Sequence, residues 1–135
     1  MTSLKMTKEK EIGDKGEEIA REFLERKGLE FLEKNYHAQG GELDIIMKDP
    51  QGDEYVFVEV KARTNEAFGY GEESITQRKF EKILSAIEAF FLKKMELEEL
   101  PFFRVDAVIV HLKKDDTYCE HIEDIGMEDF PGSYS

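Results

Sequence analysis

Three residues have the types and spacing needed to hydrolyse a phosphate ester. Glu59 and Lys61 are one residue apart, so on an extended strand both side chains lie on the same face. Asp44 lies in the preceding apolar run, between hydrophobic neighbours, where an unpaired carboxylate is energetically unfavourable. If the two runs pair as a hairpin, Asp44 approaches Glu59 to within about 5 Å.

Two carboxylates at that distance repel each other, so either one is protonated or a cation lies between them. Magnesium suits the pair because it is a hard cation that takes oxygen ligands and retains water, and manganese has the same ligand preference. Lys61 would then direct an ammonium to the same place, to hold an attacking water or to stabilise a pentacovalent phosphate. An acid and a lysine at this spacing also arise by chance as an exposed surface pair, so that alternative stays open.

The elements that must position these side chains follow from the pattern of apolar residues. Spacings of three and four predict an amphipathic helix over 12–27, ended by Gly28. Alternating or continuous apolar runs predict strands. These strands cover residues 29–37, 42–48, 55–63, 102–110 and 118–125.

A second, longer helix is expected to begin at Ser74, because Ser74 and Gln77 have the spacing of a capping box. Turn residues at 49–54 make the second and third strands an antiparallel hairpin. The third strand, the long helix and the fourth strand can form a crossover with parallel strands. The sequence therefore predicts an α/β domain with a mixed sheet, in the order α-β-β-β-α-β-β.

Length and composition favour one domain over residues 1–126, followed by a flexible tail at 127–135. The single cysteine excludes an internal disulfide, and no apolar run approaches the ~18 residues of a membrane helix. The polar start is unlike a secretory signal, so we expect a cytoplasmic protein that does not enter membranes. The net charge of −12 by itself argues against a nucleic-acid partner. A bound divalent cation would change this local balance.

Several short motifs, taken together, resemble a known family. They are Gly16-Glu17, Asn35-Tyr36-His37, the run from Gly41 to Ile46, the run from Val56 to Arg63, and Phe68-Gly69. Over roughly residues 12–110 the chain resembles the YraN-like family, which is regarded as endonuclease-like and akin to archaeal Holliday junction resolvases. The acid-x-Lys signature resembles that of the PD-(D/E)XK nucleases. This resemblance implies a restriction endonuclease-like fold and magnesium-dependent hydrolysis of DNA phosphodiester bonds, with branched recombination or repair structures among the expected substrates.

The resemblance also implies residue roles. Asp44 and Glu59 would hold the metal together with the backbone carbonyl of Val60, and Lys61 would be catalytic. The acid on the first helix that accompanies this set in the family corresponds to Glu17. Helical geometry supports Glu17 independently, because it borders the apolar stripe of that helix. A solvated helix glutamate is the alternative. Leu43 stands where the superfamily typically has proline, and this removes no ligand.

Five further residues are candidates for auxiliary roles. Arg63 continues the Glu59–Lys61 face and His37 precedes the site, so each is a candidate phosphate contact. Lys79, near the start of the long helix, is a candidate nucleic-acid contact. Glu42 could bind a second ion or orient water, and Gln77 could face nucleic acid. The alternatives are an ion pair for Arg63, a plain loop histidine, a rim acid for Glu42 and a helix cap for Gln77.

Four other polar residues are interpreted as structural. Arg104 and Asp106 lie two residues apart in the most apolar strand, which favours a pair that supports the structure or the site from behind, with direct membership of the site as the alternative. His111 and His121 do not have the spacing of metal ligands.

Cleavage of both strands of a symmetric branched substrate would require two active sites, so a homodimer is expected from the resemblance to junction resolvases. Two alternatives to a nuclease stay open. One is a nucleic-acid-binding module with the same fold and little or no cleavage. The other is an acidic protein-interaction domain that uses residues 95–135, where much of the negative charge is concentrated.

Overall fold

The computed structural model describes residues 7–64 and 75–126. The elements in chain order are α1 (Lys8–Arg26), β1 (Glu30–Ala38), β2 (Gly41–Asp49), β3 (Glu54–Thr64), α2 (Gln77–Ala89), its π-helical extension η1 (Phe90–Lys94), β4 (Phe103–Leu112) and β5 (Tyr118–Ile122). The predicted order α-β-β-β-α-β-β is thereby confirmed. The predicted tail at 127–135, the cap at Ser74 and the Phe68-Gly69 motif lie outside the described residues.

All five strands form one sheet in the order β1-β2-β3-β4-β5. The β3–β4 pair is parallel, as the predicted crossover through α2 requires, and the other neighbouring pairs are antiparallel. The predicted hairpin of β2 and β3 is confirmed, and β5 lies at an edge as expected. β3 is the central strand, whereas β4, the most apolar run, lies next to it inside the sheet. Among the described residues, no helix is long and apolar enough to cross a membrane.

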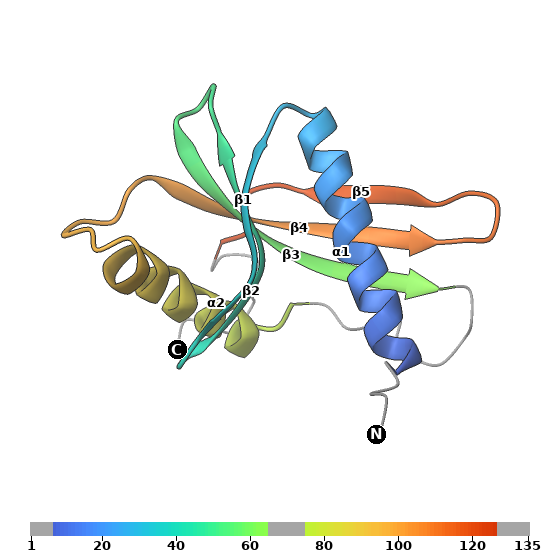
Figure 1. The fold of residues 1–135 in the computed structure, drawn as a ribbon, viewed down its shortest axis with the longest axis horizontal. Helices are drawn as coiled ribbons and strands as arrows, with labels where there is room; N and C mark the ends of the chain where they lie inside the picture. Colours follow the sequence, from blue (N-terminus) through green and yellow to red (C-terminus); the bar gives the residue numbers. More distant parts are fainter. Residues whose placement is uncertain (1–6, 65–74, 127–135) are drawn as a thin grey trace, which may run out of the picture.

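Each face of the sheet carries its own apolar core. On the α1 side, Ala20 and Leu24 pack against Val56 and Val58 of β3 and against further valines of β4. On the other side, the apolar face of α2 packs against Leu43, Ile46 and Phe57. Figure 1 shows α1 lying across β3 and β4, while α2 lies beside the β1–β2 end of the sheet. Alternating side chains of β3 therefore anchor it from both faces, since each buried aliphatic or aromatic side chain contributes about 1.5–3 kcal/mol.

The ends of the helices are set by threonine caps and a glycine. Thr7 accepts a hydrogen bond from the Lys10 amide at 3.1 Å and begins α1, and Gly28, with φ of +99°, follows its C-terminal end. Thr76 accepts from the Lys79 amide at 3.1 Å and begins α2. The predicted cap at Ser74 lies outside the described residues, and within them Thr76 caps the helix and Gln77 is its first residue.

β2 separates from β3 partway along its length. Their paired register runs from Asp49↔Glu54 to Ile45↔Val58 and ends there, although β2 stays paired with β1 as far as Gly41. The β1–β2 turn packs against α2 so closely that a Cβ on Gly41 would lie 2.7 Å from the Lys82 carbonyl oxygen. Figure 1 shows this end of the hairpin reaching toward α2 while β3 continues past α1. Asp44 and Glu59 lie where the two strands diverge.

Candidate metal and active site

Asp44 is turned toward β3 at the point where the β2–β3 ladder ends. Its Oδ2 atom accepts a hydrogen bond from the Val60 backbone amide at 2.9 Å. The alternation of β2 is broken here, because Leu43 packs in the α2-side core whereas Ile45 packs in the α1-side core. Burial, and after it the charge of Glu59, raises the pKa of Asp44 to about 8. Asp44 and Glu59 are therefore close enough for their charges to interact, in line with the predicted hairpin.

Glu59 is the second carboxylate, and its charge is balanced by a lysine from α2. It is 4% exposed, one of two buried charged residues in the described part of the chain. Lys79 Nζ lies 2.8 Å from Glu59 Oε1, and the lysine side chain is 43% exposed. Burial opposes the charge of Lys79, but its hydrogen bond to Glu59 and the nearby carboxylates outweigh burial and raise the pKa of Lys79. Lys79 is a candidate nucleic-acid contact from its sequence position, which gives no signal for this ion pair with Glu59.

Glu17 reaches the same site from α1 because the helix packs very closely on β3. Gly16 faces Ala62, and a Cβ at Gly16 would lie 2.8 Å from the Ala62 Cβ. Burial raises the pKa of Glu17, and the charges of Asp14, Glu42 and Glu59 act in the same direction. Lys34 of β1 acts against them. Glu17 is thus electrostatically linked to Glu59, as expected for a third acid near the pair.

Lys61 lies two residues beyond Glu59 on β3. Phe57 packs in the α2-side core and Val58 and Val60 pack in the α1-side core, so Glu59 and Lys61 share the α2 side of the strand, as predicted. Lys61 is half-buried, and within residues 7–64 and 75–126 its ammonium has no ion pair or hydrogen bond. Arg63 follows on the same face, opposite His111 of β4. Among the described residues neither the Lys61 ammonium nor the Arg63 guanidinium has an ion-pair partner, as expected for contacts to a negatively charged ligand.

His37 and Glu42 form an exposed pair at the rim of the site. They are register partners across β1 and β2, and His37 Nδ1 lies 3.0 Å from Glu42 Oε2. The charge of Glu42 raises the pKa of both Glu17 and Lys79, so this acid is close to the site as well as to its histidine. Gln77 donates to Glu81 at 3.2 Å along α2.

Asp44 and Glu59 offer carboxylate oxygens to a cation at this site. In the described part of the chain, no three His, Cys, Asp or Glu side chains converge on one point. Magnesium needs fewer, because it usually keeps several waters and is held by one or two carboxylates. A cation beside Asp44 and Glu59 would also relieve the repulsion that raises the pKa of Asp44. The donor set therefore fits a hard, partly hydrated divalent cation.

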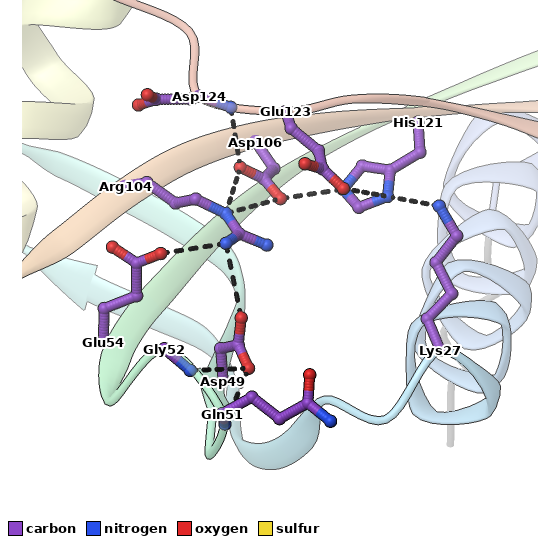
Figure 2. Close-up of polar contacts among 10 residues, drawn as sticks. All are labelled: Lys27, Asp49, Gln51, Gly52, Glu54, Arg104, Asp106, His121, Glu123 and Asp124. Carbon is purple, nitrogen blue, oxygen red and sulfur yellow. Dashed lines mark hydrogen bonds and ion pairs between the residues drawn. The ribbon is translucent and has the colours of Figure 1, made fainter.

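A second polar cluster lies at the opposite end of the β2–β3 ladder. Figure 2 shows Arg104 between three acids: its Nε donates to Asp106 at 3.0 Å, and its Nη1 lies 2.9 Å from Glu54 and 3.5 Å from Asp49. The predicted Arg104–Asp106 pair is confirmed. Two acids at the hairpin turn also contact this arginine, which the two-residue spacing alone could not indicate.

Asp106 is fully buried and joins Arg104 to β5 and the segment after it. His121 Nε2 lies 2.7 Å from Asp106 Oδ2, and the Asp124 amide donates to Asp106 Oδ1 at 3.0 Å. Lys27 Nζ lies 2.9 Å from His121 Nδ1, which assigns the ring proton to Nε2 because the ammonium can only donate. Every buried side-chain nitrogen and oxygen in the described residues has a partner. This cluster is therefore structural, as predicted for His121.

The fold and the site define a small mixed α/β domain with a carboxylate pair where two strands of its sheet diverge. Residues 16–110 match the model of the family described as "Uncharacterised protein family UPF0102". A UPF0102 protein of Clostridioides difficile is 44% identical over 103 residues, which cover 76% of this chain and 87% of that relative. A UPF0102 protein of Desulforamulus reducens is 39% identical over 111 residues, covering 82% and 89%. The chain belongs to the UPF0102 (YraN) family, which confirms the resemblance at the level of the family.

Proposed function

We propose that this protein is a metal-dependent endonuclease that hydrolyses DNA phosphodiester bonds. The observation that carries the proposal is the meeting of Asp44 and Glu59 where β2 leaves β3, in a position where burial and the neighbouring Glu59 make the charge of Asp44 unfavourable without a cation. Carboxylates whose charged form is disfavoured by burial and by a like charge cluster at functional sites.

Each residue of the site would have a different role in hydrolysis. Asp44, Glu59 and the backbone carbonyl of Val60 would hold magnesium or manganese. The bound ion supplies positive charge that activates water and stabilises the phosphate in the transition state. Lys61, whose ammonium has no partner among the described residues, would hold the attacking water and stabilise developing negative charge. Glu17, at the border of the site, would orient water through its carboxylate.

Cationic and polar side chains around the pair would contact the DNA backbone. Arg63 continues the Lys61 face, and Lys79 and His37 lie on the α2 and β1 sides of the site. The net charge of −12 makes DNA binding dependent on these few cations and on the metal. Branched DNA and a homodimer with two active sites are the corresponding substrate and assembly proposals.

Cleavage of defined DNA substrates tests the proposal. Purified protein would be incubated with magnesium or manganese and with duplex, single-stranded and four-way-junction oligonucleotides. We expect cleavage of at least one substrate, and a loss of about 100-fold or more in Lys61→Met with unchanged melting temperature. Lys93→Met, which removes an exposed lysine at the far end of the α2–η1 segment, is the matched control. Equal cleavage by the wild type and Lys61→Met would contradict the proposed role.

A DNA-binding module without cleavage is the second candidate. The observation that favours it is the Lys79–Glu59 ion pair, which neutralises one carboxylate without any metal. Junction binding in gel-shift experiments, with no cleavage in magnesium or manganese at any protein concentration, would support this alternative over the nuclease.

A further inference from the structure

We propose that Lys79 is an exchangeable cation built into the site: it neutralises Glu59 in the metal-free protein, and it releases Glu59 and binds a substrate phosphate when a divalent ion enters. This inference rests on the proposed function, since it concerns the regulation of the same site. It gives Lys79 two alternating partners, a carboxylate and a phosphodiester oxygen.

The two members of the ion pair differ in their freedom to move. Glu59 is on the central strand and its side chain is 5% exposed, so its carboxylate is held in place. The Lys79 side chain is 43% exposed, and its amide is fixed by the Thr76 cap at 3.1 Å. The ammonium can therefore swing outward on its flexible four-carbon stem while the backbone of α2 stays in place.

Competition at Glu59 supplies the driving force for exchange. Lys79 Nζ is 2.8 Å from Glu59 Oε1, so it occupies one of the few carboxylate oxygens that a divalent ion would use. A divalent ion beside Asp44 and Glu59 would repel the Lys79 ammonium from its position next to Glu59. An ion that binds in the absence of DNA must break the Lys79–Glu59 ion pair without replacement. When DNA is bound as well, the freed ammonium gains a phosphate as its new partner.

This competition predicts that metal and DNA strengthen each other's binding. The coupling between two ligands is reciprocal, so metal should raise DNA affinity by the same factor by which DNA raises metal affinity. Removal of the Lys79 charge should raise the metal affinity of the DNA-free protein and lower this shared coupling factor. Metal would bind more tightly to the free protein, and its effect on DNA affinity would fall.

Calorimetric titration of manganese into the DNA-free protein tests the exchange. We expect Lys79→Met to bind manganese about tenfold more tightly than the wild type, because no charge-assisted hydrogen bond has to be broken. Lys79→Arg keeps a cation beside Glu59 and should bind at least as weakly as the wild type. Lys82→Met removes an exposed lysine from the same helix and should leave the affinity unchanged. An affinity of Lys79→Met no higher than that of Lys82→Met would overturn the exchange.

A second measurement keeps the test independent of the stability of Lys79→Met. In the Lys61→Met background, DNA affinity would be measured with and without manganese, before and after adding Lys79→Gln. We expect manganese to increase DNA affinity in Lys61→Met, and this gain to fall about tenfold in the double variant. An equal gain in both proteins would overturn the exchange.

Failure of the exchange and failure of the proposed metal site have different signatures. Asp44→Asn, in the presence or absence of Lys79→Met, should abolish manganese binding if the carboxylate pair holds the ion. If Asp44→Asn abolishes binding but Lys79→Met leaves it unchanged, the metal site stands and the exchange is wrong. If the wild type and Asp44→Asn give the same titration, the proposed metal site itself is wrong.

Discussion

The backbone amide of Val60 donates a 2.9 Å hydrogen bond to Oδ2 of Asp44, so a side chain bridges β2 and β3 just beyond their last paired residues. This bond favours the charged form of Asp44. Burial and the nearby Glu59 oppose the charge and outweigh the bond, since the pKa of Asp44 is raised to about 8. The protein therefore holds a carboxylate in a fixed position where its charge is unfavourable.

The raised pKa of Asp44 makes the stability of the metal-free protein depend on pH. Between its ordinary pKa of 3.8 and its folded pKa of about 8, the unfolded chain has lost this proton and the folded chain keeps it. The free energy of unfolding contributed by this group should therefore fall as pH rises, by up to about 1.4 kcal/mol per pH unit. Urea unfolding of the protein in the presence of a metal chelator, repeated from pH 5 to pH 8, measures this dependence of the unfolding free energy on pH.

Asp44→Asn is the control for that slope, because the amide oxygen can still accept from the Val60 amide but cannot ionise. The variant should lose this part of the pH dependence and be more stable than the wild type at pH 8. Magnesium should raise the melting temperature of the wild type and not that of the variant. Parallel pH profiles for the two proteins would contradict the electrostatic account of Asp44.

Gly16 should tolerate no side chain. Gly16→Ala places a Cβ 2.8 Å from the Ala62 Cβ, so α1 must move away from β3 and carry Glu17 with it. We expect a loss of about 1–3 kcal/mol in the free energy of unfolding, together with weaker cleavage. Gly13→Ala is the matched control on the same helix, because a Cβ there meets nothing within 4 Å. The pair Gly16→Ala and Ala62→Gly should recover part of the loss, as a double-mutant cycle would show.

Arg104 should be irreplaceable by lysine. Its guanidinium reaches Asp106 through Nε and Glu54 through Nη1, and a single ammonium cannot reproduce that fork. Arg104→Lys should lower the free energy of unfolding by about 1–3 kcal/mol, as measured in urea. Manganese affinity should stay unchanged, because Arg104 lies at the other end of the β2–β3 ladder. Arg78→Lys on exposed α2 surface is the control, and an equal effect of both changes would contradict the bridging role.

Asp106 should determine the acid limit of stability. Burial opposes its charge, but hydrogen bonds from His121, the Asp124 amide and Arg104 outweigh burial and hold the pKa of Asp106 below its ordinary value of 3.8. Its contribution is therefore fully present above pH 4 and is lost as pH falls toward the lowered folded pKa. Asp106→Asn should lower stability by about 3–5 kcal/mol at pH 7, since Arg104 loses its buried partner. Asp106→Asn should also reduce the loss of unfolding free energy as pH falls below about 4. The same loss in the wild type and the variant would contradict this assignment.

Much of the fold could be predicted because local pattern and tertiary packing agree. The valines of β3 alternate with Phe57, Glu59 and Lys61, and this alternation alone separates the face that packs under α1 from the face that carries the site. The turn at 49–54 then sets the register that brings Asp44 near Glu59. The order of elements, the hairpin and the parallel β3–β4 pair all follow from such short-range signals.

Contacts between elements distant in sequence could not be predicted in the same way. The Lys79–Glu59 ion pair depends on where the first turn of α2 lies over β3, and no sequence spacing encodes that position. The Gly16–Ala62 contact is of the same kind, although a glycine within a predicted helix is a signal of close packing. The strand alternation also breaks between Leu43 and Ile45, where a regular period of two was assumed.

The partners of Asp106 define which part of the chain has to fold as one unit. The residues that match the family model end at 110, whereas His121 and Asp124 lie beyond them, and the Ile125 amide donates to the Val105 carbonyl at 2.7 Å. A fragment trimmed to residues 16–110 would keep Arg104 beside this fully buried acid and lose the hydrogen bonds from His121 and the Asp124 amide. The stretch after residue 110 therefore belongs to the cooperative folding unit, because it completes the shielding of a carboxylate that lies inside the matched part of the chain.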